Sequence, residues 1–147
     1  MQTENKKVPF AFVIMPFDAE FDRIYADLVK PALESVGYEV RRADSFIDQQ
    51  NILKGIIHSI NHASLIVAEL TSLNPNVLYE LGIAHGLSKP TILLTQNMEE
   101  VPFDLRPYRV IEYSTDYAEV KKLQDQLCEI ASKHKEGAIR FDNPVSD

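Results

Sequence analysis

Short, uninterrupted apolar runs alternate along this chain with segments in which apolar residues recur at helical spacing. Three of the runs occupy residues 11–15 (AFVIM), 64–70 (SLIVAEL) and 91–95 (TILLT). Runs of this length without regular polar interruption are typical of parallel strands that are buried on both faces. Strands that alternate with amphipathic helices predict a parallel sheet built from right-handed βαβ units.

This alternation predicts a three-layer α/β/α, flavodoxin-like (Rossmann-like) fold with a five-stranded parallel sheet in the order 2-1-3-4-5. Strands are expected at residues 11–15, 38–43, 64–70, 91–95 and 109–113. Helices are expected at residues 21–36, 76–88 and 117–135, and in the segment that follows residues 48–50. We expect one domain over residues 8–136 and an irregular C-terminal tail at residues 137–147.

Two of the predicted helices carry features that test this interpretation. Pro31 lies inside the helical pattern at 21–36, where it is expected to kink or split the helix. Asp18, Glu20 and Asp22 indicate a charged start of the same helix. The helix after residues 48–50 has one apolar face, formed by Ile52, Leu53, Ile56, Ile57 and Ile60.

The composition narrows the class of partner. The 147 residues carry a formal net charge of −7, which argues against nucleic acid because phosphate backbones select clustered Lys and Arg. The single cysteine, Cys128, cannot form an internal disulfide, which favours a reducing, cytoplasmic compartment. The polar start MQTENKKV predicts no signal peptide, and no apolar stretch approaches the roughly 20 residues that span a bilayer.

Several common catalytic motifs do not occur in the sequence. Neither glycine-rich phosphate loop, GxGxxG or GxxxxGKS, is present, which argues against a classical dinucleotide dehydrogenase and a P-loop NTPase. No serine lies in a GxSxG turn. His58 and His62 are four residues apart, but no third ligand accompanies them, so no metal site is predicted.

The stretch at residues 65–89 (LIVAELTSLNPNVLYELGIAHGLSK) is the most informative for function. An apolar strand leads into a short polar loop, and the loop opens a helix. Ligands of open α/β sheets bind outside the carboxyl ends of the strands. Four polar side chains are expected to gather there: Glu69, Asn74, Asn76 and Glu80. Their carboxylates and amides predict a site for a small polar molecule.

Each of these residues also has a structural interpretation. Glu80 either acts in the site or pairs with a neighbouring cation on the helix surface. Near a helix start, the macrodipole is expected to keep its carboxylate ionised, as a nucleophile requires. Glu69 is expected either to accept bonds from N–H groups of the next loop or to hold a ligand hydroxyl. Asn74 and Asn76 are good capping residues, with Asn74 as the N-cap before Pro75.

Three blocks of the sequence resemble bacterial TIR-like and nucleoside 2-deoxyribosyltransferase-like proteins. They are FVIMPF at residues 12–17, AELTSLNPNVLYELGIAHGLSKPTILL at 68–94 and PFDLRPYRVIEY at 102–113. The middle block is also similar to the 2′-deoxynucleoside 5′-phosphate N-hydrolases. The resemblance covers roughly residues 10–113, and its YELG block is specific for the superfamily rather than for a substrate.

The resemblance implies N-glycosidic chemistry with Glu80 as the catalytic nucleophile. In these families the glutamate of the ELG block attacks the anomeric C1′ of a ribosyl or deoxyribosyl group, and water or a second base then releases the sugar. Where the deoxyribosyltransferases carry a sugar-binding aspartate six residues before the nucleophile, this chain has Asn74. The expected substrate is a nucleoside, nucleotide or NAD-like molecule, and neither a metal nor a further cofactor is implied.

The remaining site residues are predicted on the same basis. Those expected to orient the ribose are Glu69, Asn74 and Asn76. Those expected to form the wall or rim of the base or sugar pocket are Met15, Pro16, Phe17, Asp44 and Tyr79.

Alternatives to an enzyme stay open at this point. Relatives include enzymes that cleave NAD and proteins that only bind, so the main alternative is a non-catalytic nucleotide-sensing or TIR-like protein-interaction module. A response-regulator domain is disfavoured because such domains need an acidic pair after the first strand, where this chain has Met15 and Pro16. Since the relatives often complete their sites across a dimer, we expect a homo-oligomer.

Overall fold

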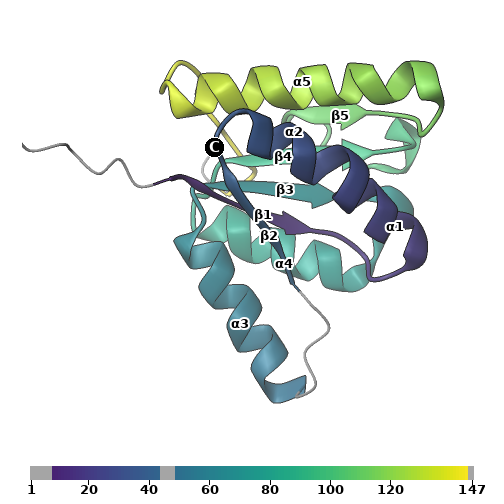
Figure 1. Cartoon of the computed structure of the whole chain (residues 1–147). Coiled ribbons are helices and arrows are strands. Elements are labelled where there is room, and N and C mark those ends of the chain that lie inside the picture. Colours follow the sequence, from purple (N-terminus) through teal and green to yellow (C-terminus); the bar gives the residue numbers. More distant parts are fainter. Residues whose placement is uncertain (1–7, 44–48, 146–147) are drawn as a thin grey trace, which may run out of the picture.

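Five parallel strands form a single sheet in the order β2-β1-β3-β4-β5 (Figure 1). The computed structural model describes residues 8–43 and 49–145. The strands are β1 (Phe10–Ile14), β2 (Glu39–Arg42), β3 (Leu65–Glu69), β4 (Thr91–Thr95) and β5 (Val110–Glu112). The predicted fold class and strand order are confirmed, because each strand lies at its expected place in the chain and pairs with its expected neighbours.

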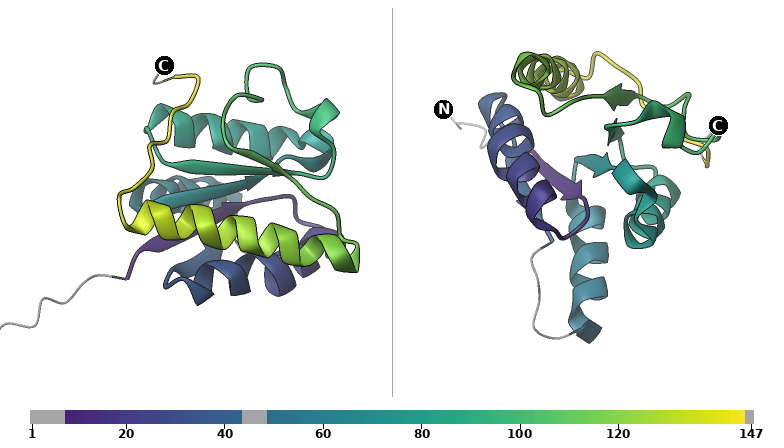
Figure 2. Two further views of the ribbon diagram at one scale, coloured as in Figure 1. Left: turned by 90° about the horizontal axis from the view of Figure 1, so that it is seen from above. Right: turned by 90° about the vertical axis from the view of Figure 1, so that its right-hand side faces the viewer.

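Helices cover both faces of the sheet (Figures 1 and 2). One face carries α1 (Ala19–Ile24), the π-helical turn η1 (Tyr25–Val29), α2 (Lys30–Ser35) and α5 (Tyr117–Lys135). The other carries α3 (Gln49–His62) and α4 (Pro75–Gly86). Strand side chains alternate between two cores, so Val13 packs on the α1 side and Phe12 on the α4 side. None of these described helices is both long and apolar enough to cross a membrane.

The first helical segment accommodates Pro31 through the π-helical turn. In η1, which directly precedes α2, the Lys30 N–H donates to the Tyr25 carbonyl, five residues earlier. Proline has no N–H, and its ring crowds the carbonyl four residues before it. A widened turn at this point relieves that conflict. The expected interruption is therefore a change in hydrogen-bond register, because Val29 and Lys30 keep right-handed helical angles.

The apolar face of α3 is only partly covered. Ile56 and Ile60 are buried in the core on the α4 side of the sheet, whereas Leu53 and Ile57 remain 42% and 38% exposed. Figure 1 shows α3 extending away from the sheet toward its N-terminal end. The sequence predicts a single apolar face on this helix. In the structure, packing buries the part of that face formed by Ile56 and Ile60 and leaves the part formed by Leu53 and Ile57 exposed.

The connections that leave the carboxyl ends of the strands meet at one edge of the sheet, on the right in Figure 1. In register, Ile14 at the end of β1 lies beside Ala68 near the end of β3. The chain therefore leaves these two strands at neighbouring points. The order of the strands also reverses between β1 and β3, which is where open α/β sheets usually form their ligand crevice.

Candidate functional site

Glu69 ends β3 and is completely buried, with 0% of its surface exposed. Its Oε1 accepts a hydrogen bond from the Thr71 N–H, and its Oε2 accepts one from the Tyr113 hydroxyl. A buried carboxylate needs such partners. Both oxygens are thus engaged within the protein, and one donor belongs to the loop that follows the strand. A direct contact of Glu69 with ribose stays a prediction.

A chain of hydrogen bonds leads from Glu69 to the surface. The Gln96 Nε2 lies 3.3 Å from both the Tyr113 hydroxyl and the Glu20 Oε1, and the Gln96 N–H donates to the Thr71 Oγ1 (3.0 Å). Burial raises the pKa of Glu69, the hydrogen bonds from Thr71 and Tyr113 oppose this shift, and repulsion by Glu20 adds to it. The network ties the carboxyl ends of β3, β4 and β5 to α1.

Asn74 starts α4 as the N-cap, as the sequence predicts. Its Oδ1 accepts from the N–H groups of Asn76 (2.9 Å) and Val77 (3.4 Å), and Pro75 occupies the first helical position. The Asn74 carbonyl oxygen accepts from Leu78 (3.1 Å). Asn76 is itself exposed in the first turn of the helix. Capping therefore explains Asn74, whereas no hydrogen bond between the exposed amide of Asn76 and another described residue is seen.

Glu80 lies on the flank of α4, next to the buried face that contains Val77 and Leu81. Asn76, four residues earlier, is on the same side of the helix. The Glu80 side chain is half-buried. Within residues 8–43 and 49–145, no hydrogen bond or ion pair engages its carboxylate. Pairing with a neighbouring cation, the structural interpretation of Glu80, is therefore not seen among these residues.

Burial raises the pKa of Glu80 from 4.5 to about 7. Burial therefore acts against the ionisation that the sequence analysis attributes to the helix dipole. Glu80 is the sixth residue of α4, whereas the dipole acts within the first turn. Removal of water around the side chain dominates instead, because it disfavours the charged form.

The segment that follows β1 is held in place by Arg42, the last residue of β2. Met15 and Pro16 are buried, and Phe17 is 57% exposed. The Arg42 Nη2 donates to the Pro16 carbonyl (2.8 Å), and its guanidinium lies 5.1 Å from the centre of the Phe17 ring. Its Nη1 is paired with Asp22 in α1 (2.7 Å). This buried guanidinium therefore fixes the loop that the sequence predicts to line a pocket.

The predicted site residues that the structure describes differ in accessibility. The segments after β1 and β3 lie side by side. Tyr79 is on α4 and is 61% exposed, which suits a residue at a rim. Asp44 lies outside the described residues. The residues whose side chains are open to a ligand are thus Phe17, Asn76, Tyr79 and Glu80, whereas Glu69 is closed off.

Sequence reasoning did not single out Arg42, Gln96 or Tyr113 for this region. Their partners are far away in the chain: Arg42 pairs with Asp22, and Tyr113 with Glu69. No local spacing signals such contacts. The one usable signal is position, since all three residues stand at the carboxyl end of a predicted strand or directly after it.

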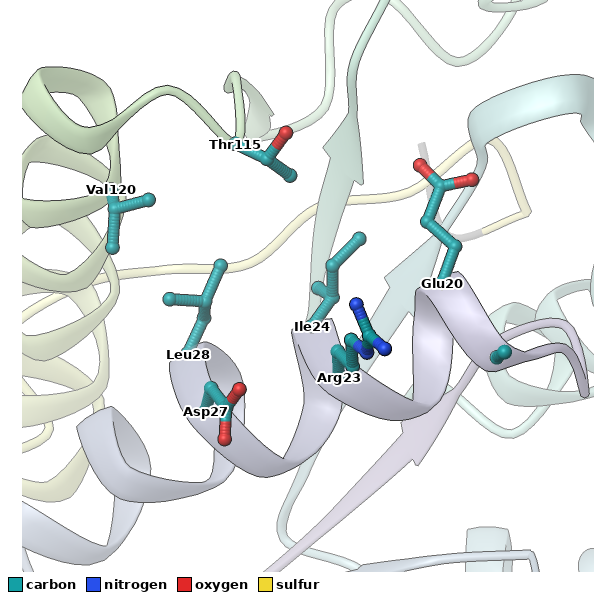
Figure 3. Close-up of a pocket in the computed structure, with 8 residues that line it drawn as sticks. Glu20, Arg23, Ile24, Asp27, Leu28, Thr115 and Val120 are labelled. Carbon is teal, nitrogen blue, oxygen red and sulfur yellow. The ribbon is translucent and has the colours of Figure 1, made fainter.

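A separate groove of about 510 Å³ opens between α1 and the first turns of α5 (Figure 3). This volume is typical of small-ligand pockets. The groove combines apolar and charged side chains and contains none of the predicted site residues. Its lining includes Glu20, Arg23, Ile24, Asp27, Leu28, Thr115 and Val120.

The histidines that are four residues apart lie together on α3. The rings of His58 and His62 have centres 4.0 Å apart, and the His62 Nδ1 lies 2.9 Å from the His58 carbonyl oxygen. In the part of the chain that the structure describes, no group of three His, Cys, Asp or Glu side chains is arranged to hold a metal ion.

Comparison with known proteins identifies the fold. No family model matches the sequence, and no curated protein matches it either. Among solved structures, a CMP N-glycosidase from Clostridium botulinum is similar with a TM-score of 0.61 and 21% identity, over 80% of this chain and 97% of that chain. A 2-deoxyribosyltransferase from Leishmania mexicana is similar with a TM-score of 0.56 and 17% identity, over 76% of this chain and 77% of that one.

A prokaryotic SEFIR domain is also similar, with a TM-score of 0.56 and 14% identity over 84% of this chain and 92% of that domain. At these identities the likeness concerns the fold alone. The chain therefore has a nucleoside 2-deoxyribosyltransferase-like/TIR-like fold, and the resemblance that the sequence motifs indicate is confirmed at that level.

Proposed function

We propose that this chain cleaves or transfers the N-glycosidic bond of a nucleoside, nucleotide or NAD-like substrate, with Glu80 as the nucleophile. The observation that carries the proposal is the half-buried Glu80 carboxylate, which no described residue pairs and whose pKa burial raises to about 7. A carboxylate of this kind is basic enough to attack and is still partly ionised at neutral pH. The fold that the chain shares with two enzymes named for N-glycosidic and deoxyribosyl chemistry supports this reaction class.

The proposed reaction runs in two steps through a sugar ester of Glu80. In the first, a Glu80 carboxylate oxygen attacks C1′, and the electron pair of the C1′–N bond leaves with the base. A purine or pyrimidine base takes up a proton from solvent as it leaves, whereas the nicotinamide of an NAD-like substrate leaves as a neutral molecule and needs none. In the second, water or the nitrogen of another base attacks C1′, loses its proton to solvent and restores the Glu80 carboxylate. Both steps pass through an oxocarbenium-like transition state, which a neighbouring carboxylate stabilises.

The other predicted residues take supporting roles in this proposal. Asn76 shares a helix face with Glu80, and this supports the assignment of its exposed amide to orienting the ribose. The Asn74 Oδ1 is used by the helix cap, which leaves its Nδ2 to donate to a ribose hydroxyl. Through Thr71, Glu69 holds the β3–α4 connection that leads to Asn74. Met15, Pro16, Phe17, Asp44 and Tyr79 are proposed to surround the base or sugar.

Base release tests the proposal directly. The purified chain and its Glu80→Gln variant are incubated with nucleosides, nucleotides and NAD, and free bases are separated by chromatography. Release by the wild type alone supports the proposal. Glu119→Gln is the matched control, because this exposed carboxylate on α5 lies outside the site. Equal release by wild type and Glu80→Gln would exclude Glu80 as the nucleophile.

A non-catalytic interaction module is the second candidate function. It is favoured by the likeness to a SEFIR domain and by the exposed stripe of Leu53 and Ile57 on α3, since exposed apolar patches often mark interaction sites. Under either function we propose that the chain self-associates. Sedimentation of the wild type and of a Leu53→Asn/Ile57→Asn variant tests this, and a wild type that stays monomeric at every concentration contradicts it.

A further inference from the structure

We infer that His58 and His62 of α3 bind one divalent ion of a late first-row transition metal, with water in the remaining coordination positions. The pocket that these rings line is bordered by residues at the amino ends of β1, β2 and β3. Glu80 is not among its lining residues, so this site is separate from the proposed function. The inference follows from the position of the two rings, the atoms that they present and the pocket around them.

The two imidazole rings lie next to each other on the exposed side of α3. His58 and His62 are about one helical turn apart, so both side chains project to the same side. Their ring centres are 4.0 Å apart and their planes meet at 33°. Two nitrogens bound to one ion, each at roughly 2.0–2.1 Å, lie only about 3 Å from each other. The rings are therefore close enough to share an ion, and histidines four residues apart on a helix are a recurrent metal-binding arrangement.

A backbone contact determines which nitrogen of His62 is left for a ligand. Its Nδ1 lies 2.9 Å from the His58 carbonyl oxygen. A carbonyl oxygen only accepts, so Nδ1 carries the proton, and Nε2 of the neutral ring carries the lone pair. Metal-binding histidines commonly donate their other N–H to a backbone carbonyl in this way, which fixes the orientation of the ring. The neutral form of His62 is thus already the form that binds a metal.

Both rings line a pocket of about 590 Å³, which is closed in part by the starts of β1 and β2. Two of the hydrogen-bond donors in its wall are already in use. The Nε and Nη2 of Arg41 both donate to the Glu39 Oε1, the former at 2.9 Å. The Ser64 Oγ donates to the Phe10 carbonyl (3.0 Å). An anion would have to displace these bonds, whereas a metal ion needs only the imidazole lone pairs.

The charges around the pocket are compatible with a cation. His62 is the last residue of α3, where the negative end of the helix dipole favours positive charge. The nearby ammonium of Lys89 is engaged, because it donates to the carbonyls of Asn61 (2.6 Å) and Ala63 (3.1 Å). Within residues 8–43 and 49–145, no group bonds to the Oε2 of Glu39. Since Glu39 lines the same pocket, this oxygen is available to a metal-bound water.

Two imidazoles and water select the class of ion. Imidazole nitrogen suits Ni²⁺, Cu²⁺ and Zn²⁺, whereas Mg²⁺ and Ca²⁺ require oxygen ligands. The sequence analysis predicts no metal site because the pair lacks a third ligand, and the described residues provide no group of three. Water takes the positions that a third residue would otherwise fill. Affinity should therefore be highest for Cu²⁺, measurable for Ni²⁺ and Zn²⁺, and absent for Mg²⁺.

Titration calorimetry of the untagged chain with NiCl₂ tests the inference. We expect one Ni²⁺ per chain, no heat of binding with MgCl₂, and at least about tenfold weaker Ni²⁺ binding in His62→Gln, which removes one ligand. Binding of Ni²⁺ to the variant as tightly as to the wild type overturns the inference. So does a wild type that binds no Ni²⁺.

A variant of identical composition separates a shared ion from independent histidines. Lys54→His/His58→Lys exchanges two exposed residues of α3 and moves the two histidines two turns apart, about 12 Å along the helix axis. One ion cannot bridge this distance, so Ni²⁺ affinity should again fall by at least about tenfold. Unchanged affinity would mean that each histidine binds alone, and would overturn the shared site. Circular dichroism of the variant checks that its helix content is kept.

Electron paramagnetic resonance of the Cu²⁺ complex gives a second, structural readout. The nitrogen splitting should indicate two imidazole ligands in the wild type and one in Lys54→His/His58→Lys. A single nitrogen ligand in both proteins overturns the inference, even if the affinities differ.

Discussion

Two glutamates, one at the end of β3 and one in the following helix α4, have opposite surroundings. Glu69, at the end of β3, is fully buried, and both of its oxygens accept hydrogen bonds from Thr71 and Tyr113. Glu80, on the flank of α4, is half-buried, and none of the described residues bonds to it. Burial raises the pKa of both carboxyl groups.

Glu69 is therefore a structural carboxylate, whereas no described residue uses the carboxylate of Glu80. The desolvation of Glu69 is offset by donors that also hold three strand ends together, so its removal is expected to act on folding. Among the described residues no donor offsets the desolvation of Glu80, and under the proposed function this carboxylate serves the substrate. The predictions below challenge this division, beginning with the largest expected effect.

Glu80→Ala is expected to lower the kcat/KM for base release by at least about 1,000-fold, because a nucleophile is lost from the reaction. Formate, added to the same variant, should restore part of the activity by occupying the vacated space and attacking C1′. Base release measured across formate concentrations checks both effects. A variant that keeps more than a tenth of its activity would remove Glu80 from the covalent step.

Glu69→Ala is expected to lower the free energy of unfolding by about 2–4 kcal/mol, because it leaves the Thr71 N–H and the Tyr113 hydroxyl buried without an acceptor. Urea denaturation followed by circular dichroism measures the loss. Glu80→Ala is the comparison and should change stability by less than about 1 kcal/mol. The division between the two glutamates fails if their effects on stability are equal.

The pH dependence of Glu80 should appear in both activity and stability. Its pKa is about 7 in the folded chain against an ordinary value of 4.5. Base release should therefore rise with pH and level off above about 7, where the nucleophile is ionised. Between pH 4.5 and 7 the unfolded chain binds fewer protons than the folded one, so this group's contribution to stability falls as pH rises.

Unfolding measured at several pH values isolates the effect of Glu80 ionisation on stability. Relative to Glu80→Gln, the wild type should lose on the order of 1–3 kcal/mol between pH 4.5 and 7 and nothing further above pH 8. A constant difference between the two proteins across this range would show that burial does not raise the pKa of Glu80.

Tyr113→Phe is expected to lower the free energy of unfolding by about 1–2 kcal/mol, because one oxygen of Glu69 loses its donor. Tyr79→Phe is the matched control: its ring is 61% exposed, so stability should change by less than about 0.5 kcal/mol. Thermal unfolding monitored by circular dichroism compares the two variants. Equal shifts would mean that the Tyr113 hydroxyl contributes little to the Glu69 network.

The fold was largely predictable because its signals are local. Each strand is a short apolar run, and each helix repeats apolar residues every three or four positions, so neither signal requires a distant contact. The start of α4 is of the same kind, since Asn74 caps residues two and three positions ahead of it. Asp18, which caps α1 through Phe21, follows the same rule.

The site was predictable in part, and the gaps have a common cause. The sequence placed Glu69 and Glu80 near the same edge, but it treated the dipole of α4 as decisive for Glu80. Desolvation by neighbouring elements proved larger. Likewise, helical periodicity gave α3 one apolar face, whereas packing left Leu53 and Ile57 exposed.

By itself, the sequence determined the class of fold, the order of the strands and the N-cap of α4, because these depend on spacing along the chain. Only the tertiary structure decided that Tyr113, 44 residues beyond Glu69, bonds to it, and that Arg42 at the end of β2 pairs with Asp22 in α1. It also decided that Glu80 is half-buried without a partner among the described residues. Burial and long-range pairing arise only when separate elements pack together, and they control the charge of a carboxylate more strongly than its place in a helix.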